Sequence, residues 1–352
     1  MTGLILRVAV PSPLYQIFDY LPPPGCDPAT LQSGVRVRVP FGRRRVVGFL
    51  LERVTATAID PAVLRPAEAV LDVEPILPAE VLVLLNWAQR YYHHPPGDVF
   101  ATALPVLLRQ GEAAAPPQIP PSWCITATGQ AALADPAALR RAPAQRLLLE
   151  HLAQCPDGAE TEALRPLVQA STATLRALHG KGWVELIAPS LPTEPVIPTT
   201  VPPPSLTLNA AQSAAITTVA AELDRFGVFL LEGITGSGKT EVYLRLIAAV
   251  LAQGRQALVL TPEIGLTPQL LARFRERLPG PLAVLHSGLS DRERLNAWLL
   301  ARTGTAQVIV GTRSAIFAPL HNPGLLIVDE EHDPSFKQQD GFRYHARDLA
   351  VV

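Results

Sequence analysis

Several features that mark other protein classes are scarce in this chain of 352 residues. No uninterrupted apolar run reaches the roughly 18 residues that a membrane-spanning helix needs, so the sequence predicts no membrane span. Arg7 interrupts the apolar N-terminal stretch and no small-residue cleavage site follows, which argues against a secretory signal peptide. The few cysteines are isolated and lack metal-ligand spacing: Cys26, Cys124 and Cys155. We expect ordinary thiols in a reducing cytoplasm.

An excess of charge of one sign is also lacking. The formal net charge is −1, so bulk electrostatics does not indicate nucleic acid. Lysine stands only at Lys181, Lys239 and Lys337, and every other basic side chain is arginine. Apolar residues make up 48% of the chain, which is enough to bury proper cores. The length predicts two or three domains.

One glycine-rich stretch organises the rest of the chain. Residues 228–231 are an apolar run that predicts a short buried strand, and residues 241–251 carry apolar side chains at helical spacing. Between them, Gly233-x4-Gly238-Lys239-Thr240 has the Walker A spacing. Glycines let backbone N–H groups curl around phosphates, and the helix N-terminus adds favourable partial charge. The predicted phosphate-loop residues are Gly233, Thr235, Gly236, Ser237, Gly238, Lys239 and Thr240.

A second motif completes a predicted ATP site. The apolar run 325–328 ends in Asp329-Glu330-Glu331-His332, and carboxylates at the carboxyl end of a parallel strand face the ligand crevice. Lys239 is expected to reach the β- and γ-phosphates, while Thr240 and Asp329 hold Mg²⁺. Glu330 is expected to polarise the attacking water. Gln212, just before the phosphate-loop strand, is placed to read the adenine edge with its two-way amide.

Residues 1–108 predict a small β-rich domain. Residues 34–51 alternate apolar and basic side chains around a turn at Gly42 and Arg43, which predicts a β-hairpin. Six arginines between Arg36 and Arg53 form a local basic patch that suits phosphates. A solvated strand face explains the same residues equally well.

The middle of the chain changes to helical periodicity. Residues 109–121 are rich in Ala and Pro and predict a linker. Residues 122–188 predict helices at 144–153, 161–169 and 171–179 followed by a strand, the order of a winged helix. The third helix offers only Arg176 and His179, too few for sequence-specific readout, so contact with protein and contact with a nucleic-acid backbone both stay open. Residues 189–205 predict a proline-rich extended spacer.

Residues 206–352 predict a doubly wound parallel α/β lobe. Buried runs at 256–262, 282–288 and 307–315 end in small, hydroxyl or charged residues, among them Thr312, Arg313 and Ser314. Such groups at strand tips suit contacts to a nucleic-acid backbone. After the acidic motif, aromatic and cationic side chains alternate: Phe336, Lys337, Phe342, Arg343, Tyr344, His345 and Arg347. Rings for base stacking with cations for phosphates favour a single-strand contact, although a loop that tucks its rings under the lobe has the same pattern.

Taken together, these stretches resemble the first motor lobe of superfamily 2 helicases and, more narrowly, the primosomal protein N′ (PriA) family of replication-restart helicases. The matching stretches run in the same order over essentially the whole chain: Phe18–Tyr20, Val37–Gly42, Gly233–Thr240, Leu260–Thr267, His286–Gly288, Gly311–Ala315, Asp329–His332 and Phe336–Asp348. The resemblance implies a multidomain α/β protein with a RecA-like ATPase lobe.

The resemblance also implies a function. The N-terminal domain would bind the 3′ end of a nascent strand at a stalled fork, with Phe18, Asp19 and Tyr20 near that pocket and Arg43 among the DNA contacts. The motor would use ATP and Mg²⁺ to move 3′ to 5′ on forked and single-stranded DNA, with His332 coupling DNA occupancy to the ATP site. Primosome proteins, a replicative helicase loader and single-strand-binding protein are the implied partners, in the cytoplasm near the nucleoid.

The family continues into a second motor lobe, a cysteine-rich zinc module and a C-terminal DNA-binding domain, whereas this chain stops at Val352. Zinc is therefore expected only in the part that is missing here. The sequence indicates an N-terminal portion that binds ATP and DNA with little unwinding. The alternative is a fork- and partner-binding module whose lobe binds nucleotide without productive turnover. A kinase or GTPase is disfavoured because no Asn-Lys-x-Asp motif occurs.

Overall fold

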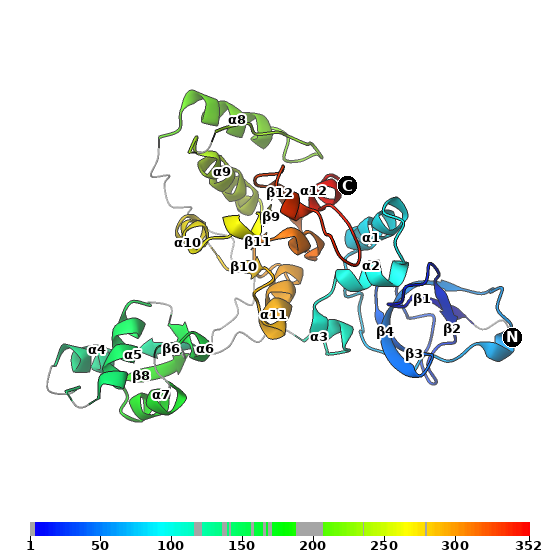
Figure 1. Ribbon diagram of the computed structural model, residues 1–352, viewed down its shortest axis with the longest axis horizontal. Coiled ribbons are helices and arrows are strands. Elements are labelled where there is room, and N and C mark those ends of the chain that lie inside the picture. Colours follow the sequence, from blue (N-terminus) through cyan, green and yellow to red (C-terminus); the bar gives the residue numbers. More distant parts are fainter. Residues whose placement is uncertain are drawn as a thin grey trace. The chain divides into compact units, whose positions relative to one another are not determined.

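The computed structural model describes residues 4–115, 122–135, 139–140, 142–155, 158–164, 167, 171–187, 207–234, 236–278 and 280–352. The chain divides into two compact units, one of Met1–Pro117 with Glu194–Val352 and one of Gln118–Thr193 (Figure 1). The whole of the predicted spacer 189–205 and the loop residue Thr235 lie outside the described residues.

An antiparallel sheet begins the first unit, with the strand order β2-β1-β4-β3-β5. Its strands are β1 (Ile5–Ala9), β2 (Phe18–Tyr20), β3 (Arg36–Phe41), β4 (Arg44–Val54) and β5 (Ala69–Val70). The predicted hairpin is confirmed: β3 pairs with β4 and Phe41 lies opposite Arg44. Gly42 has a φ of +60°, a left-handed conformation that glycine adopts without strain.

Helices follow this sheet and join a core that is shared with the rest of the unit. They are α1 (Ala79–Tyr91), α2 (Pro96–Thr102) and α3 (Val106–Arg109), after a short 3-10 helix, η1 (Pro61–Val63). Proline precedes or opens each α-helix, where its missing N–H costs nothing. Leu85 and Phe100 lie in one apolar cluster with Trp298 of the C-terminal part, so these helices and the second sheet bury each other.

A parallel sheet forms the C-terminal part, with the strand order β10-β11-β9-β12. Its strands are β9 (Gln256–Leu260), β10 (Leu282–Leu285), β11 (Val308–Gly311) and β12 (Pro323–Val328), all in parallel register. The helices are α8 (Ala210–Ala220), α9 (Lys239–Ala252), α10 (Pro268–Arg277), α11 (Asp291–Arg302) and α12 (Ala346–Val351). Short 3-10 helices η3 (Glu263–Gly265), η4 (Arg313–Phe317) and η5 (Pro334–Phe336) connect them. The predicted parallel runs at 256, 282, 307 and 325 are confirmed as strands.

The strand predicted immediately before the phosphate loop is not found. Residues 228–231 have no strand assignment, and Val228 and Leu230 are 64% and 72% exposed. This prediction was wrong because an apolar run reports a tendency to be buried and does not specify a pairing partner. In the described residues the outer edge of β12, where Leu326 is also exposed, stays without a neighbouring strand.

The second unit is a small α/β body. Its sheet has the order β7-β6-β8, from β6 (Ser122–Ile125), β7 (Ala159–Glu160) and β8 (Val184–Ile187). Its helices are α4 (Ala127–Ala134), α5 (Pro143–Ala153), α6 (Thr161–Leu164) and α7 (Ser171–Gly180). The helices predicted at 144–153 and 171–179 are confirmed, and the one predicted at 161–169 is described as helix only to Leu164.

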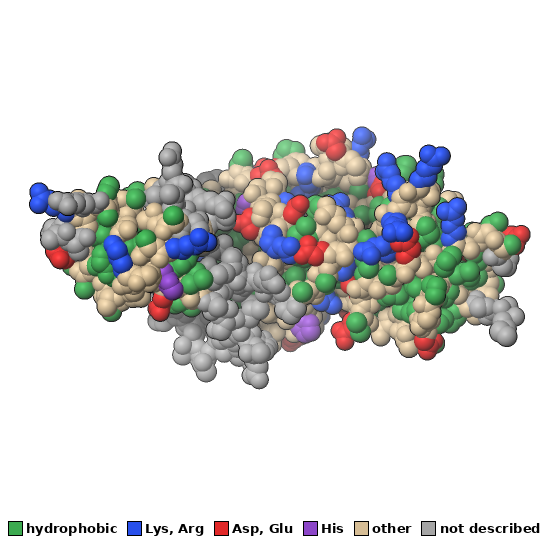
Figure 2. Space-filling view, turned by 90° about the horizontal axis from the view of Figure 1, so that it is seen from below, with side chains coloured by type: hydrophobic (Ala, Val, Ile, Leu, Met, Phe, Trp, Pro, Cys, Tyr) green, Lys and Arg blue, Asp and Glu red, His purple; other side chains and the backbone are tan. Residues whose placement is uncertain are grey.

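The surface matches the neutral overall charge. In the space-filling view basic and acidic side chains are interspersed over the face that is shown (Figure 2). None of the helices in the described part of the chain is long and apolar enough to cross a membrane.

Candidate functional site

The phosphate loop enters helix α9 through two glycines in left-handed backbone conformation. Gly236 has φ +81° and Gly238, the N-cap of α9, has φ +83°. A Cβ at Gly238 would also lie 2.4 Å from the Gln212 side-chain nitrogen. The first turn of α9 leaves backbone N–H groups without acceptors inside the helix. The loop therefore has the conformation and the donors that an anion site requires.

Lys239 joins the two motifs that the sequence singled out. Its Nζ donates to the Gly233 carbonyl over 2.7 Å and lies 3.6 Å from Glu330 Oε1. The carboxyl end of β12 is thus next to the start of α9, which places Asp329 and Glu330 beside the loop. This is the arrangement that the Walker A and acidic motifs predict.

Tyr243 is a member of the site that the sequence did not single out. Its hydroxyl donates to Asp329 Oδ1 over 3.1 Å. Burial raises the pKa of Asp329, the bond from Tyr243 opposes that shift, and Glu330 adds to it. Burial and the neighbouring Asp329 raise the pKa of Tyr243 as well, so this hydroxyl stays a donor. Tyr243 follows Lys239 by one helical turn, and this spacing on one face was the available signal.

Glu330 has an unusual backbone. Its φ is +49°, a left-handed conformation that side chains other than glycine rarely adopt and that concentrates at functional sites. Its carboxylate is half exposed and lies 3.8 Å from His332 Nε2. His332 therefore lies beside Glu330, a member of the predicted ATP site. We expect His332 to couple the binding of DNA to that site.

Both ends of the Gln212 amide form hydrogen bonds, and one of them contacts the phosphate loop. Its Oε1 accepts from the Asn209 N–H in a capping box at the start of α8, and its Nε2 donates to the Ser237 carbonyl over 3.1 Å. An adenine would have to replace one of these bonds. In this structure Gln212 ties α8 to the phosphate loop, and its reading of adenine remains a prediction.

These groups fit a Mg²⁺–nucleotide. Thr240 lies in the first turn of α9, next to the loop, and the carboxylate of Asp329 supplies the oxygen that Mg²⁺ prefers. Among the described residues, the Lys239 ammonium contacts a carbonyl and a carboxylate, which phosphate oxygens can replace.

The rings predicted to stack on bases lie in the core instead. Phe336 is fully buried and Tyr344 is 2% exposed, its ring 4.9 Å from that of Phe317. Arg313 also points inward: its Nη1 donates to the carbonyls of Ser335 and Lys337. The loop thus has its rings tucked under the lobe, the arrangement that the sequence left as the alternative, and Arg343 stays exposed at its surface.

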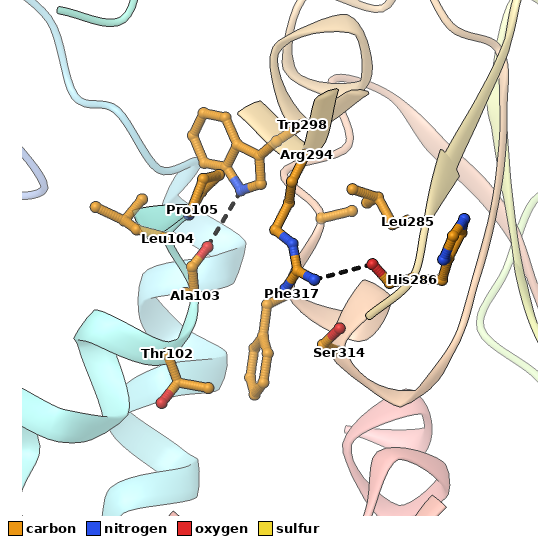
Figure 3. A pocket seen from close by; sticks show the side chains of 11 residues that line it. Thr102, Ala103, Leu104, Pro105, Leu285, His286, Arg294, Trp298, Ser314 and Phe317 are labelled. Atoms are coloured by element: carbon orange, nitrogen blue, oxygen red, sulfur yellow. Dashed lines mark hydrogen bonds between the residues drawn. The ribbon is translucent and has the colours of Figure 1, made fainter. Parts of the chain in front are cut away.

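The strand-tip residues divide in the same way. Thr312 is buried, whereas Ser314 is exposed. Ser314 lines a small cavity of about 50 Å³ between the α2–α3 connection and the parallel sheet with α11 and η4. Figure 3 shows this junction, where Trp298 Nε1 donates to the Ala103 carbonyl over 3.1 Å and Arg294 donates to the His286 carbonyl. A cavity this small holds a few waters, not a ligand.

The three residues predicted near a 3′-end pocket lie together on β2. The Asp19 carboxylate accepts from Thr57 Oγ1 and lies 3.6 Å from Arg7 Nε. The Tyr20 hydroxyl donates to the Pro40 carbonyl, and Phe18 is half-buried with its ring edge-on to Phe41. Asp19 and Tyr20 thus hydrogen-bond to other residues of this domain, and Phe18 packs against one of its rings.

The basic patch of the hairpin needs a correction. Arg36 is fully buried, and its guanidinium donates to both oxygens of Asp72 and to the carbonyls of Leu108 and Glu112. Arg36 therefore belongs to the core, because a buried carboxylate and two carbonyls accept hydrogen bonds from all three of its guanidinium nitrogens. Arg43, at the turn, is exposed.

Comparisons with known proteins agree with this geometry. Residues 7–105 match the family described as the PriA 3′DNA-binding domain (3′BD), and residues 209–351 match the DEAD/DEAH box helicase family. The chain is 41% identical to the replication restart protein PriA of Haemophilus influenzae over 99% of its own length and 47% of that relative. The chain is thus similar to PriA proteins along nearly all of its own length.

Other PriA proteins show the same match. The PriA of Bacillus subtilis is 31% identical over 95% of this chain and 49% of its own length. That of Chlamydia pneumoniae is 33% identical over 99% of this chain and 46% of its own length. The chain spans about half the length of the curated PriA relatives it matches. Its DEAD/DEAH helicase domain implies the use of ATP.

Proposed function

We propose that this chain is the N-terminal half of an ATP-dependent DNA helicase of replication restart, which binds ATP–Mg²⁺ and forked DNA and, in the complete protein, moves 3′ to 5′. The observation that carries the proposal is the meeting of Lys239 with Glu330 at 3.6 Å, beside Asp329. A phosphate-binding lysine next to a carboxylate pair is the arrangement that phosphoryl transfer to water needs.

The residues divide the chemistry among them. Lys239 would exchange its carbonyl partner for phosphate oxygens, and the first N–H groups of α9 would hold the same phosphates. Thr240 and Asp329 would hold Mg²⁺, which neutralises phosphate charge when it is bound. Glu330 would orient the attacking water and accept its proton. Tyr243 would keep Asp329 ionised and fixed in position.

The domain assignment belongs to the same proposal. Residues 1–108 would bind the 3′ end of a nascent strand, 122–188 would be a winged helix, 189–205 a spacer and 206–352 the first ATPase lobe. In the aromatic loop Lys337 and Arg343 would contact phosphates, while the buried rings fix the loop. Primosome proteins, a helicase loader and single-strand-binding protein are the partners we propose for the complete protein.

Nucleotide binding tests the ATP site directly. Fluorescent ATP should bind the 352-residue chain, and Lys239→Ala should weaken the affinity at least tenfold. Lys181→Ala, at the lysine that pairs with Gln145 in the second unit, is the matched control and should not change it. Glu330→Gln should keep binding and lose DNA-stimulated hydrolysis. Equal binding by Lys239→Ala and the control would refute the ATP site.

A binding module without productive turnover is the alternative, and the strained, half-exposed Glu330 is the residue that decides between the two. Hydrolysis that DNA stimulates and that Glu330→Gln abolishes favours the motor. Fork binding without such hydrolysis favours the module. Preference for forks with a free over a blocked 3′-OH, lost in Asp19→Asn, tests the 3′-end pocket separately.

A further inference from the structure

A second cavity, of about 700 Å³, lies away from the nucleotide site. It opens between the β3–β4 hairpin, helices α2 and α3, and residues 341–342 of the loop that follows the acidic motif. We call it the hairpin groove. Its charged lining comes from Arg38, Arg45, Arg109 and Asp98. Its volume is within the range that holds a drug-sized group, which matches one or two nucleotides and excludes a duplex.

The arginines of the hairpin groove are mostly free to bind a ligand. Within the described residues, Arg38 and Arg109 have no carboxylate within 4 Å, and Arg45 pairs only with Glu68 at the surface. Gly111, with φ +92°, lets the backbone approach Arg38 so closely that a Cβ there would lie 2.7 Å from its Nη2. The chain therefore holds this guanidinium beside the groove without neutralising it.

A further arginine lies near Arg109. Burial lowers the pKa of Arg109, and the nearby Arg294 lowers it further, against Asp291. Unpaired arginines in a partly enclosed space attract anions, and the planar guanidinium forks suit phosphates in particular. Val47 and Val106 add apolar wall, against which sugars can pack.

We propose that the hairpin groove binds the phosphate backbone of a single DNA strand, with Arg38, Arg45 and Arg109 as its contacts. This inference rests on the proposed function as a DNA-binding motor. One wall belongs to the segment that matches the 3′DNA-binding domain and another to the segment that matches the helicase domain. A DNA strand bound in the hairpin groove would therefore contact both segments. Asp98 opposes phosphates at one side and limits where the strand can lie.

The salt dependence of binding tests the groove. Affinity for a short fluorescein-labelled oligo-dT is measured by anisotropy over a range of salt concentrations, with the 352-residue chain. Each phosphate contact contributes about 0.7 to the slope of log K against log salt, so Arg38→Gln/Arg45→Gln/Arg109→Gln should reduce the slope by about 2. Asp98→Asn removes a repulsive charge and should tighten binding.

Two further variants keep the test independent of folding and of total charge. Arg275→Gln removes an exposed arginine of α10 outside the groove and should leave the slope unchanged. Gln110→Trp fills the groove without changing charge and should weaken binding about tenfold at every salt concentration. Unchanged thermal melting shows that each variant is folded.

The outcomes separate the two proposals. If the parent chain binds oligo-dT but the triple variant keeps its slope, or the α10 control loses as much, the groove is not a DNA site. If the triple variant keeps DNA binding but loses binding of a poly-glutamate peptide, the groove serves an acidic protein partner and the proposal is overturned. If the parent chain binds no DNA at all, the proposed function itself fails.

Discussion

Replacing Arg36 should destabilise the protein without removing a DNA contact. Arg36 lies in the hairpin among arginines that look alike in sequence, yet its side chain is fully buried. Its Nη2 lies 2.6 Å from Asp72 Oδ1 and its Nε 2.9 Å from Asp72 Oδ2. The other terminal nitrogen, Nη1, donates to the carbonyls of Leu108 and Glu112 over 2.6 and 2.9 Å. The side chain thus ties β3 to the segment that follows α3.

The size of the effect follows from these contacts. In Arg36→Met the Asp72 carboxylate, whose side chain is 7% exposed, is left without its cation. Breaking a buried ion pair from one side costs about 3–5 kcal/mol. With a slope of about 2 kcal/mol per molar urea, the unfolding midpoint of the first unit should fall by roughly 2 M. Replacing both partners, with Asp72→Leu added, should recover much of this loss, because no charge is then left buried.

Urea titration followed by tryptophan fluorescence measures the midpoint, and the four corners of a double-mutant cycle give the coupling energy. Arg44→Met, at the exposed end of β4, is the matched control and should shift the midpoint little. The reasoning is refuted if Arg36→Met unfolds at the same urea concentration as the control. It is equally refuted if folded Arg36→Met shows a smaller slope of log K against log salt in DNA binding, which is the result expected of the triple variant of the hairpin groove.

Three further predictions concern the nucleotide site and the junction. Tyr243→Phe removes the bond that lowers the pKa of Asp329, so the acid limb of Mg²⁺–ATP binding should move to higher pH, measured as affinity against pH. Glu330→Val puts a β-branched side chain at φ +49° and should lower the free energy of unfolding by about 1–3 kcal/mol, measured by urea titration. Trp298→Phe leaves a buried carbonyl without its donor and should cost about 1–3 kcal/mol in the same assay.

The first two of these predictions have matched controls. Tyr92→Phe, at a hydroxyl that contacts Asp348 instead, should leave the pH limb in place, and an equal shift would refute the role of Tyr243. Glu331→Val, at a neighbour with ordinary backbone, should cost less than Glu330→Val. The raised pKa of Asp329 also determines how the free energy of unfolding depends on pH. Because the pKa of Asp329 is higher in the folded protein, its contribution to stability is full at low pH and is lost as the pH rises through the folded pKa.

Sequence alone determined the features that depend on neighbours along the chain. Local periodicity predicted the hairpin, the parallel strands and helix α9. The rule that carboxyl ends of parallel strands share one edge predicted the meeting of Lys239 with the acidic motif. Motif spacing selected the ATP-site residues because phosphate chemistry demands those side chains at that spacing.

Only the tertiary structure decided which face of each side chain is used. Arg36 and Arg43 have the same charge and lie seven residues apart. Asp72, two residues after β5, pairs with Arg36 in the core, whereas Arg43 stays in solvent. Phe336 and Tyr344 alternate with cations as stacking residues would. In the fold both lie in the apolar cluster, where the ring of Tyr344 packs against that of Phe317. Alternation records that two faces differ; which face meets the core depends on long-range neighbours that no local pattern contains.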